Sequence, residues 1–326
     1  MKKKILIVTT GGTIAMKHNS PFGVVPNDEF AEHLRSFPQL DEVAVIDVFE
    51  FSNIPSPFMN PVIMLELAKT IDKMITDYDG AVITHGTDTL EETAYMLDLI
   101  LKTNKPVIFT AAMRSNSELG LDGPRNIVGA VRVAASEQSS NRGVLVVMND
   151  EVDSARDVVK TDSSKTDSFI SPSLGLLGVV DPDRIIFYRR LEKLEKILTD
   201  SIEPNIDLIK CCSGMDGRFI DASIKNGAKA IVVEAFGRGN VPKTILPSLE
   251  NAIKKNIIIV LVSRTYTGRV LAEYGYEEGG LFLQKKGVIL GGDLKGPKMR
   301  IKLMVLFGKY GNATDVKKYL LNNKEN

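Results

Sequence analysis

The stretch LIVTTGGTIAMKHN, residues 6–19, begins as a run of branched apolar residues and stops abruptly at two threonines, two glycines and a third threonine. An apolar run that ends in turn residues predicts a buried β-strand followed by a tight turn. Because glycine lets the backbone approach another segment closely, this turn would hold the hydroxyl of Thr13 in a fixed place. The simplest interpretation is a strand-to-helix turn with Thr13 as the helix cap.

Similar apolar runs alternate with helical patterns along the whole chain. The expected strands are ILIV, FEF, AVIT, PVIFTAA, GVLVVM, IDLIKCC, AIVVEAF and IIIVLVS, and the expected helices lie near residues 61–78, 90–101, 123–135, 218–226, 242–255 and 297–307. Continuous apolar strands between helices indicate a parallel sheet covered on both faces. We therefore predict an α/β protein with a larger N-terminal domain, whose mainly parallel sheet is covered by helices, and a smaller C-terminal α/β domain.

Polar and charged segments suggest where these domains divide. Residues 150–173 are rich in Ser, Thr and Asp and are predicted to form a long loop, and residues 181–200 are expected to form an exposed connector. We predict an N-terminal catalytic domain over residues 1–190, a linker over 191–210 and a C-terminal domain over 211–326.

Composition limits the classes of function. The chain has 326 residues, with 41 Lys plus Arg and 41 Asp plus Glu, so it lacks the excess of positive charge that nucleic-acid binding demands. The apolar run in MKKKILIVTT is too short for a secretory signal, and no run approaches the ~18 apolar residues of a membrane span. We expect a cytoplasmic protein that binds neither nucleic acid nor membrane. Its three histidines are scattered, so no metal site is predicted, and His85 is expected to be a packed residue at a strand end.

The ends of the predicted strands carry the candidate chemistry, since parallel sheets bind ligands beyond the carboxyl ends of their strands. TTGGT, HGTDT and AAMRS follow three of the strands at residues 9–13, 85–89 and 111–115, and Lys160 lies further on. A threonine hydroxyl becomes a nucleophile when a base or a charge activates it, and glycine N–H groups can stabilise an oxyanion. Thr87, Asp88 and Lys160 could supply a second hydroxyl with an acid and a base beside it.

Structural interpretations of these residues remain open at this point. An Asp or Thr of HGTDT could simply cap the following helix, and Lys160 could be a solvated loop residue. Neither G-x-G-x-x-G nor G-K-[ST] occurs in the first turn, which argues against a dinucleotide or phosphate loop there.

Both threonine motifs together resemble the two signature segments of bacterial-type L-asparaginases. These are VTTGGTIA at residues 8–15 and GAVITHGTDTLEET at residues 80–93. The resemblance covers nearly the whole chain, because other segments are similar to further parts of that family: NIPSPFMNP at 53–61, TAAMRS and LDGPRNI at 110–127, ARDVVKTDSSKTDSF at 155–169 and GGDLKGPKMRIKLM at 291–304.

The resemblance implies an amidohydrolase that converts L-asparagine to L-aspartate and ammonia through a threonyl acyl-enzyme intermediate, without a cofactor. By position in the motifs, Thr13 would be the primary nucleophile, and Thr87, Asp88 and Lys160 would form a second hydrogen-bonded group. The implied substrate contacts are Ser56 and Asp88 for the α-carboxylate and α-amino groups, and the backbone at Ala112 for the side-chain amide. The family also implies a homodimer or homotetramer, in which the N-terminal domain of one subunit meets the C-terminal domain of another at the active site.

Alternative functions are a glutaminase, an amidase acting on glutaminyl groups of charged transfer RNA, and a non-catalytic amino-acid-binding regulatory protein that keeps the fold. Two departures from the family pattern bear on them. The lid MKHNSPFGVVPND, residues 16–28, has Phe22 and no tyrosine to assist the first threonine, and Pro57 stands where many members have a glutamine.

A hydroxyl from a neighbouring chain could replace the missing tyrosine. The segment SRTYTGRVLAEYGYEEGG, residues 263–280, follows a predicted strand and holds three of the eight tyrosines. We hypothesise that Tyr274 or Tyr276 is a possible relay that reaches the site from the partner subunit. The competing interpretation is that these tyrosines only pack at the subunit interface.

Overall fold

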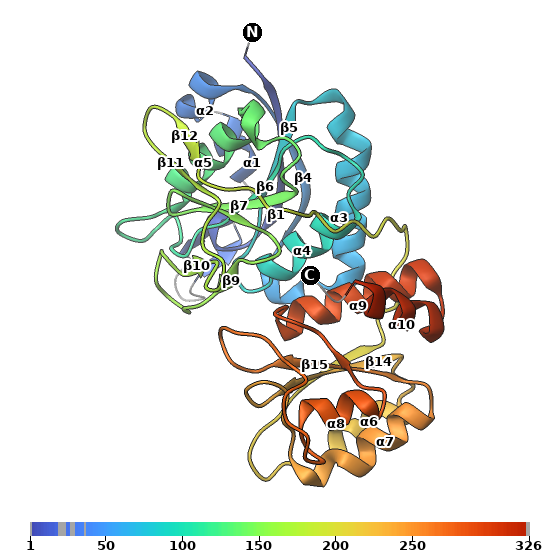
Figure 1. Cartoon of the computed structure of the whole chain (residues 1–326). Coiled ribbons are helices and arrows are strands. Elements are labelled where there is room, and N and C mark those ends of the chain that lie inside the picture. Colours follow the sequence, from blue (N-terminus) through green and yellow to red (C-terminus); the bar gives the residue numbers. More distant parts are fainter. Residues whose placement is uncertain (1, 19–23, 27–29, 36, 324–326) are drawn as a thin grey trace. The chain divides into compact units, whose positions relative to one another are not determined.

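The computed structural model describes residues 2–18, 24–26, 30–35 and 37–323 (Figure 1). The chain forms two compact units, Met1–Leu198 and Thr199–Asn326. This division falls inside the range 191–210, and the last five residues of that range form β13 (Ile206–Lys210), a strand of the second unit. Phe22 lies outside the described residues, as do the side chains of His18 and His33.

An eight-stranded sheet is the centre of the first unit. Five neighbouring strands run parallel to one another, and the remaining three add antiparallel pairs at one edge. In spatial order the strands are β12 (Ile185–Phe187), β11 (Gly178–Val180), β8 (Glu151–Ser154), β7 (Val144–Met148), β6 (Val107–Thr110), β5 (Gly80–Thr84), β1 (Lys4–Gly11) and β4 (Val45–Ile54). The mainly parallel sheet predicted from the apolar runs is confirmed.

Helices cover both faces of this sheet. One face packs against α1 (Phe30–Arg35), α2 (Pro38–Val43) and α5 (Gly123–Ala135), through a core that includes Ile7, Val82 and Ile108. Every residue of β5, β6 and β7 is buried, so the other face is covered as well. There α3 (Pro61–Met74) packs on α4 (Leu90–Ile100), and α4 packs on β7. The start of α3 is fixed by Asn60, whose side-chain oxygen accepts hydrogen bonds from the N–H groups of Val62 and Ile63.

The segments predicted as loop and connector are partly strand, so those two predictions were wrong. Residues 150–173 contain β8 and the hairpin of β9 (Val159–Lys160) with β10 (Phe169–Ile170), and residues 181–200 contain β12. These strands are two to four residues long. They pair largely with neighbouring strands, such as β8 with β7 and β12 with β11, and strands this short show no periodic pattern in the sequence.

Short elements complete the first unit. β2 (Met16–His18) pairs with β3 (Val24–Pro26) in a separate two-stranded antiparallel sheet. Single 3₁₀ turns are η1 (Thr13–Ala15), η2 (Ser56–Phe58), η3 (Ile75–Asp77) and η4 (Glu137–Ser139).

The second unit has a four-stranded parallel sheet in the order β13, β14 (Ala230–Ala235), β15 (Ile258–Ser263) and β16 (Ile289–Leu290). Its helices are α6 (Arg218–Lys225), α7 (Leu246–Lys254), α8 (Gly280–Lys285), α9 (Gly296–Tyr310) and α10 (Ala313–Asn322), and η5 (Lys243–Ile245) precedes α7. The smaller C-terminal α/β domain is thereby confirmed.

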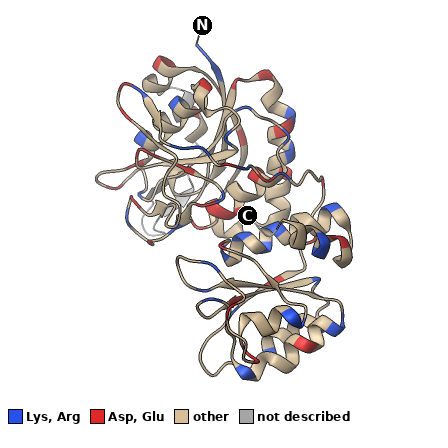
Figure 2. Cartoon of the chain, viewed as in Figure 1, with Lys and Arg blue, Asp and Glu red and all other residues tan. Residues whose placement is uncertain are grey.

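Charges of both signs are distributed over the elements of each unit. Figure 2 shows Lys and Arg interspersed with Asp and Glu, in keeping with their equal numbers of 41 each. Within the described part of the chain, no helix is both long and apolar enough to cross a membrane.

Candidate active site

The strand order of the first unit creates a switch point between β1 and β5. The chain leaves β1 toward β4 on one side, whereas it leaves β5 toward β6 on the other. The carboxyl ends of these two neighbouring strands form the switch point, which is where open α/β sheets bind ligands. Thr9 of β1 lies opposite Thr84 of β5, so the turns that carry Thr13 and Thr87 begin side by side.

Glycines bring these two turns into backbone contact. A Cβ atom at Gly12 would lie 2.2 Å from Cα and 2.3 Å from N of Gly86, and Gly12 has a φ of +84°, which side chains disfavour. A Cβ atom at Gly86 would in turn lie 2.7 Å from the Oγ atom of Ser56. Only glycine at these two positions allows the ends of β1 and β5 and the turn at Ser56 to meet.

Thr13 is the first residue of η1 and is half-buried. The cap of η1 is Gly12, so the interpretation of Thr13 as a helix cap was wrong. The short helix is held from within by the Ala15 N–H, which donates to the Gly12 carbonyl at 2.9 Å, and from outside by Asn116, whose side-chain nitrogen donates to the Ile14 carbonyl at 3.2 Å. The hydroxyl of Thr13 is thus carried on a fixed turn.

Thr87, Asp88 and Lys160 are directly connected. The Lys160 Nζ donates to Thr87 Oγ1 at 2.8 Å and to Asp88 Oδ1 at 2.7 Å. The Lys160 side chain is 18% exposed and that of Asp88 is 56% exposed, while Thr87 is buried. Lys160 is therefore not a solvated loop lysine. The structure brings together the three residues that the sequence grouped.

Ser56 joins this group from the end of β4. Its Oγ accepts a hydrogen bond from the Asp88 N–H at 3.2 Å, and its carbonyl accepts one from the hydroxyl of Thr89 at 2.9 Å. Thr89 occupies the N-cap position of α4, but its hydroxyl bonds to Ser56 and does not cap the helix. The capping interpretation of HGTDT was accordingly wrong.

Ala112 follows β6 and is buried. Its methyl group and the side chain of Ile14 pack against Gly123. A Cβ atom at Gly123 would lie 3.4 Å from the Ala112 methyl group and 3.2 Å from the Ile14 side chain. The peptide before it is anchored by Asn126, whose side-chain nitrogen donates to the Ala111 carbonyl at 3.0 Å. The Ala112 backbone is therefore fixed next to the segment that follows Thr13.

His85 is a packed strand-end residue, as predicted. It is fully buried, its Nδ1 bonds to the Gly86 carbonyl at 2.8 Å, and its Nε2 bonds to the Thr93 hydroxyl at 3.0 Å. A carbonyl only accepts, so Nδ1 carries a proton and donates it. Burial lowers the pKa of His85 to about 4, so the ring stays neutral at physiological pH.

We expect His85 to make stability depend on pH. Its folded-state pKa of about 4 lies below its ordinary 6.5, so its contribution is lost as pH falls through that window, by on the order of 3 kcal/mol. His85→Gln should therefore flatten the fall in melting temperature between pH 7 and pH 4, measured by calorimetry.

Asp153 is the control residue, because we expect its effect on stability to change with pH in the opposite direction to that of His85. Burial raises the pKa of its carboxyl from 3.8 to about 6, so its contribution is lost as pH rises between those values. Asp153→Asn should therefore make the melting temperature fall more steeply between pH 7 and pH 4, whereas His85→Gln should make it fall less steeply. Equal slopes in the unaltered protein and in both variants would contradict these assignments.

Glu91 is a site residue that the sequence did not single out. Its Oε2 accepts a hydrogen bond from the main-chain N–H of Lys160 at 3.0 Å, across 69 residues of sequence. It stands within the segment HGTDTLEET, but no local pattern indicates which distant backbone group it meets.

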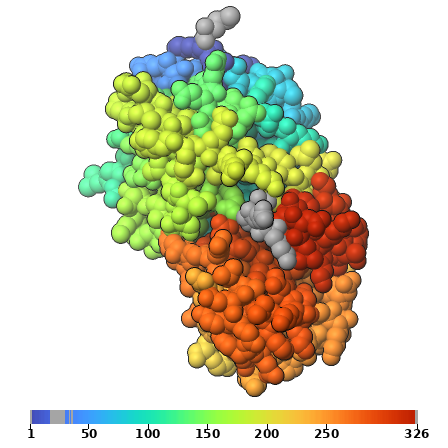
Figure 3. Space-filling view, viewed as in Figure 1, coloured from blue at the N-terminus to red at the C-terminus, as the bar shows by residue number. Residues whose placement is uncertain are grey.

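Tyr274 and Tyr276 lie in the loop between β15 and α8 of the second unit. Their rings are 5.7 Å apart at the centroids, and both side chains are partly exposed, at 39% and 51%. In the space-filling view, the orange part of the chain that includes this loop is at the surface (Figure 3). Nearby Glu273 pairs with Arg238 at 2.9 Å.

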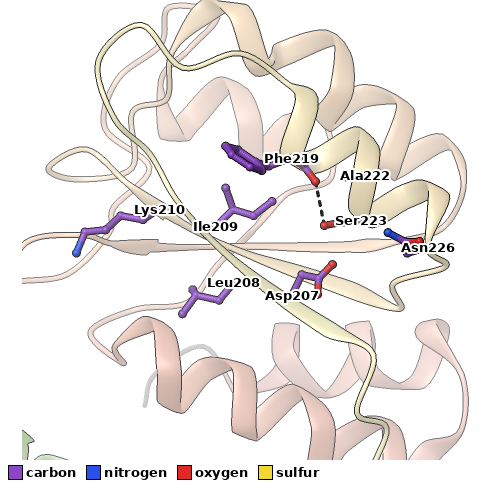
Figure 4. A pocket seen from close by; sticks show the side chains of 8 residues that line it. All are labelled: Asp207, Leu208, Ile209, Lys210, Phe219, Ala222, Ser223 and Asn226. Atoms are coloured by element: carbon purple, nitrogen blue, oxygen red, sulfur yellow. Dashed lines mark hydrogen bonds between the residues drawn. The ribbon is translucent and has the colours of Figure 1, made fainter. Parts of the chain in front are cut away.

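A groove of the second unit runs between β13 and α6 (Figure 4). Asp207 and Lys210 are its charged lining residues, the ring of Phe219 projects over it, and the Ser223 hydroxyl donates to the Phe219 carbonyl at 3.1 Å. No predicted site residue is among the residues that line this groove.

Comparisons with known proteins identify the family of the chain. The family model described as "Asparaginase, N-terminal" matches residues 4–193, and the one described as "Glutaminase/Asparaginase C-terminal domain" matches residues 205–320. The chain therefore belongs to the asparaginase family, whose members are amidohydrolases.

Individual relatives cover nearly the whole chain. An L-asparaginase of Bacillus licheniformis is 37% identical over 95% of this chain and 97% of its own length. A probable periplasmic L-asparaginase of Haemophilus influenzae is 36% identical over 97% and 91%. The crystal structure of a probable cytoplasmic L-asparaginase from Campylobacter jejuni has a TM-score of 0.88 at 34% identity, covering 98% of this chain and 99% of that one. Further relatives at 31% identity, from two Pseudomonas species, are named glutaminase-asparaginase.

Proposed function

We propose that the protein hydrolyses L-asparagine to L-aspartate and ammonia, with Thr13 as the nucleophile. The observation that carries this proposal is the pairing of two threonine turns at the switch point, one of them bonded to Lys160 at 2.8 Å. In the first half-reaction, Thr13 Oγ1 bonds to the amide carbon, the carbon–nitrogen bond breaks, and the nitrogen leaves as ammonia with the hydroxyl proton. In the second, water attacks the ester and returns a proton to Thr13, releasing aspartate.

The group around Thr87 suits the second half-reaction. Because Thr87 Oγ1 accepts a hydrogen bond from Lys160 Nζ, its own hydroxyl proton points elsewhere and can bond to the attacking water. The ion pair between Lys160 and Asp88 keeps the amine in place beside Thr87. Every step uses hydroxyl, amine, carboxylate and water, so the proposal requires no cofactor or metal.

Recognition of the amino acid is assigned to Ser56, Asp88 and Ala112. The Oγ of Ser56 accepts from the Asp88 N–H, so its hydroxyl proton can be donated to the substrate α-carboxylate. The half-exposed carboxylate of Asp88 can pair with the α-ammonium group. The fixed backbone at Ala112 would contact the side-chain amide.

We further propose a homodimer or homotetramer in the cytoplasm. The name of the Campylobacter relative supports that compartment, whereas the name of the Haemophilus relative points to the periplasm.

Ammonia release by the purified protein tests the function. We expect release from L-asparagine, with aspartate formed in equal amount. Names of the Pseudomonas relatives make L-glutamine the second substrate to measure. Faster release from glutamine would make the protein a glutaminase, and binding of asparagine without any ammonia would favour the regulatory alternative.

The tyrosine hypothesis gives a separate expectation. If Tyr274 or Tyr276 relays a proton from the partner subunit, Tyr274→Phe or Tyr276→Phe should lower kcat by roughly 10²–10⁴-fold, because only the hydroxyl is removed. Steady-state kinetics with a check of oligomeric state would measure this. Near-normal turnover in both variants would mean that the relay comes from elsewhere and that these tyrosines only pack.

A further inference from the structure

The hairpin that carries Lys160 stands apart from the eight-stranded sheet. Lys160 lies opposite Phe169, and Val159 lies opposite Ile170, in a sheet of only two strands. Each strand has two residues, and an isolated hairpin of this kind is marginally stable at best. Contacts from outside the hairpin must therefore fix the main chain of Lys160.

Glu91 makes such a contact at Lys160 itself. Its carboxylate accepts the Lys160 N–H at 3.0 Å, and Glu91 stands in the first turn of α4, where the helix dipole favours a negative charge. α4 begins two residues after Asp88. One short segment, residues 87–91, thus holds both the main-chain nitrogen of Lys160 and its side-chain nitrogen.

The strand opposite Lys160 is attached independently. The Ser171 hydroxyl donates to Asp153 Oδ1 at 2.5 Å, and Asp153 is a buried residue of β8 in the main sheet. The Thr161 N–H closes the hairpin by donating to the Ser168 carbonyl at 2.7 Å. Loss of the Glu91 carboxylate would therefore loosen the strand of Lys160 and leave the opposite strand attached to the main sheet.

We propose that Glu91 is a positioning residue, whose carboxylate holds the main chain of Lys160 so that Nζ stays within hydrogen-bonding distance of Thr87. This inference rests on the proposed function, in which Lys160 serves the reaction. A lysine side chain is long and flexible, so a fixed main chain works together with the ion pair to Asp88 to keep the amine beside Thr87. Displacement of a reacting group by about 1 Å can cost about a hundredfold in rate.

Substitutions of Glu91 separate its hydrogen bond from its charge. Glu91→Ala should lower kcat for L-asparagine by about ten- to a hundredfold, with KM changed by less than about threefold. Glu91→Gln keeps an acceptor oxygen for the Lys160 N–H and should retain kcat within about threefold of the unaltered enzyme. Glu92→Ala is the matched control, because it removes the same charge from the same turn of α4.

Hydrogen exchange provides a readout that does not depend on turnover. Peptides covering residues 156–172 should exchange faster in Glu91→Ala than in Glu92→Ala. Equal exchange in these two variants, or a kcat of Glu91→Gln as low as that of Glu91→Ala, would overturn the inference. Absence of ammonia release from the unaltered protein would instead overturn the proposed function.

Discussion

Thr13→Ala is expected to retain the fold and the oligomeric state and to lose activity by several orders of magnitude. The substitution removes the hydroxyl that would form the acyl bond, so covalent catalysis is lost. It leaves the backbone contact of Gly12 with Gly86 unchanged, because that contact involves no side chain of residue 13. Initial rates of ammonia release, together with the melting temperature, measure both expectations.

Thr13→Ser and Thr10→Val are the controls for this result. Serine restores a hydroxyl and should recover part of the activity. Thr10→Val removes a neighbouring hydroxyl that donates to the Thr84 carbonyl at 3.0 Å within the sheet, so it should lower stability more than turnover. A Thr13→Ala enzyme that keeps more than about a tenth of the unaltered turnover would rule out Thr13 as the nucleophile, because loss of an acyl-forming residue costs far more.

Lys160→Met and Thr87→Val should each abolish measurable turnover, and the double variant should be hardly worse than either single one. The two side chains share one hydrogen bond of 2.8 Å, so removing either partner disables the same unit. Rates of all four enzymes, compared as a double-mutant cycle, measure the coupling.

Lys165→Met is the matched control in the same hairpin. Lys165 is exposed, and its N–H bonds to Asp162 at 3.0 Å in the hairpin turn, so its side chain should be dispensable. Losses that add up clearly across Lys160 and Thr87 would show that the two residues do not act together.

Long periodic elements could be predicted from the sequence, whereas short paired ones could not. The predicted helix 90–101 corresponds to α4 (Leu90–Ile100), and 123–135 corresponds to α5, because their apolar spacing and flanking turn residues are local signals. Strands β8 to β12 have no such signal. They are two to four residues long, too short to show a period, and each is fixed by the strand it pairs with, as Val152 of β8 is by Gly178 of β11.

The candidate site divides in the same way. Residue types at strand ends identified Thr13, Thr87 and Asp88 as neighbours, since parallel strands place their carboxyl ends together. Family resemblance was needed for Ser56 and Ala112, and the bond between Lys160 and Thr87 spans 73 residues of sequence. Glu91 was not predicted because a carboxylate that accepts the backbone N–H of a distant residue has no sequence signature.

The contact between Gly12 and Gly86 has a consequence for redesign of substrate preference. A Cβ at Gly12 would need the space of Gly86, and a Cβ at Gly86 would need the space of Ser56, so neither glycine can be varied alone, and no residue smaller than glycine could compensate. In libraries that randomise both signature turns, most variants would therefore be unable to form the backbone contact between the two turns. Diversity is better directed to positions outside this contact, such as Pro57 and the loop after β6.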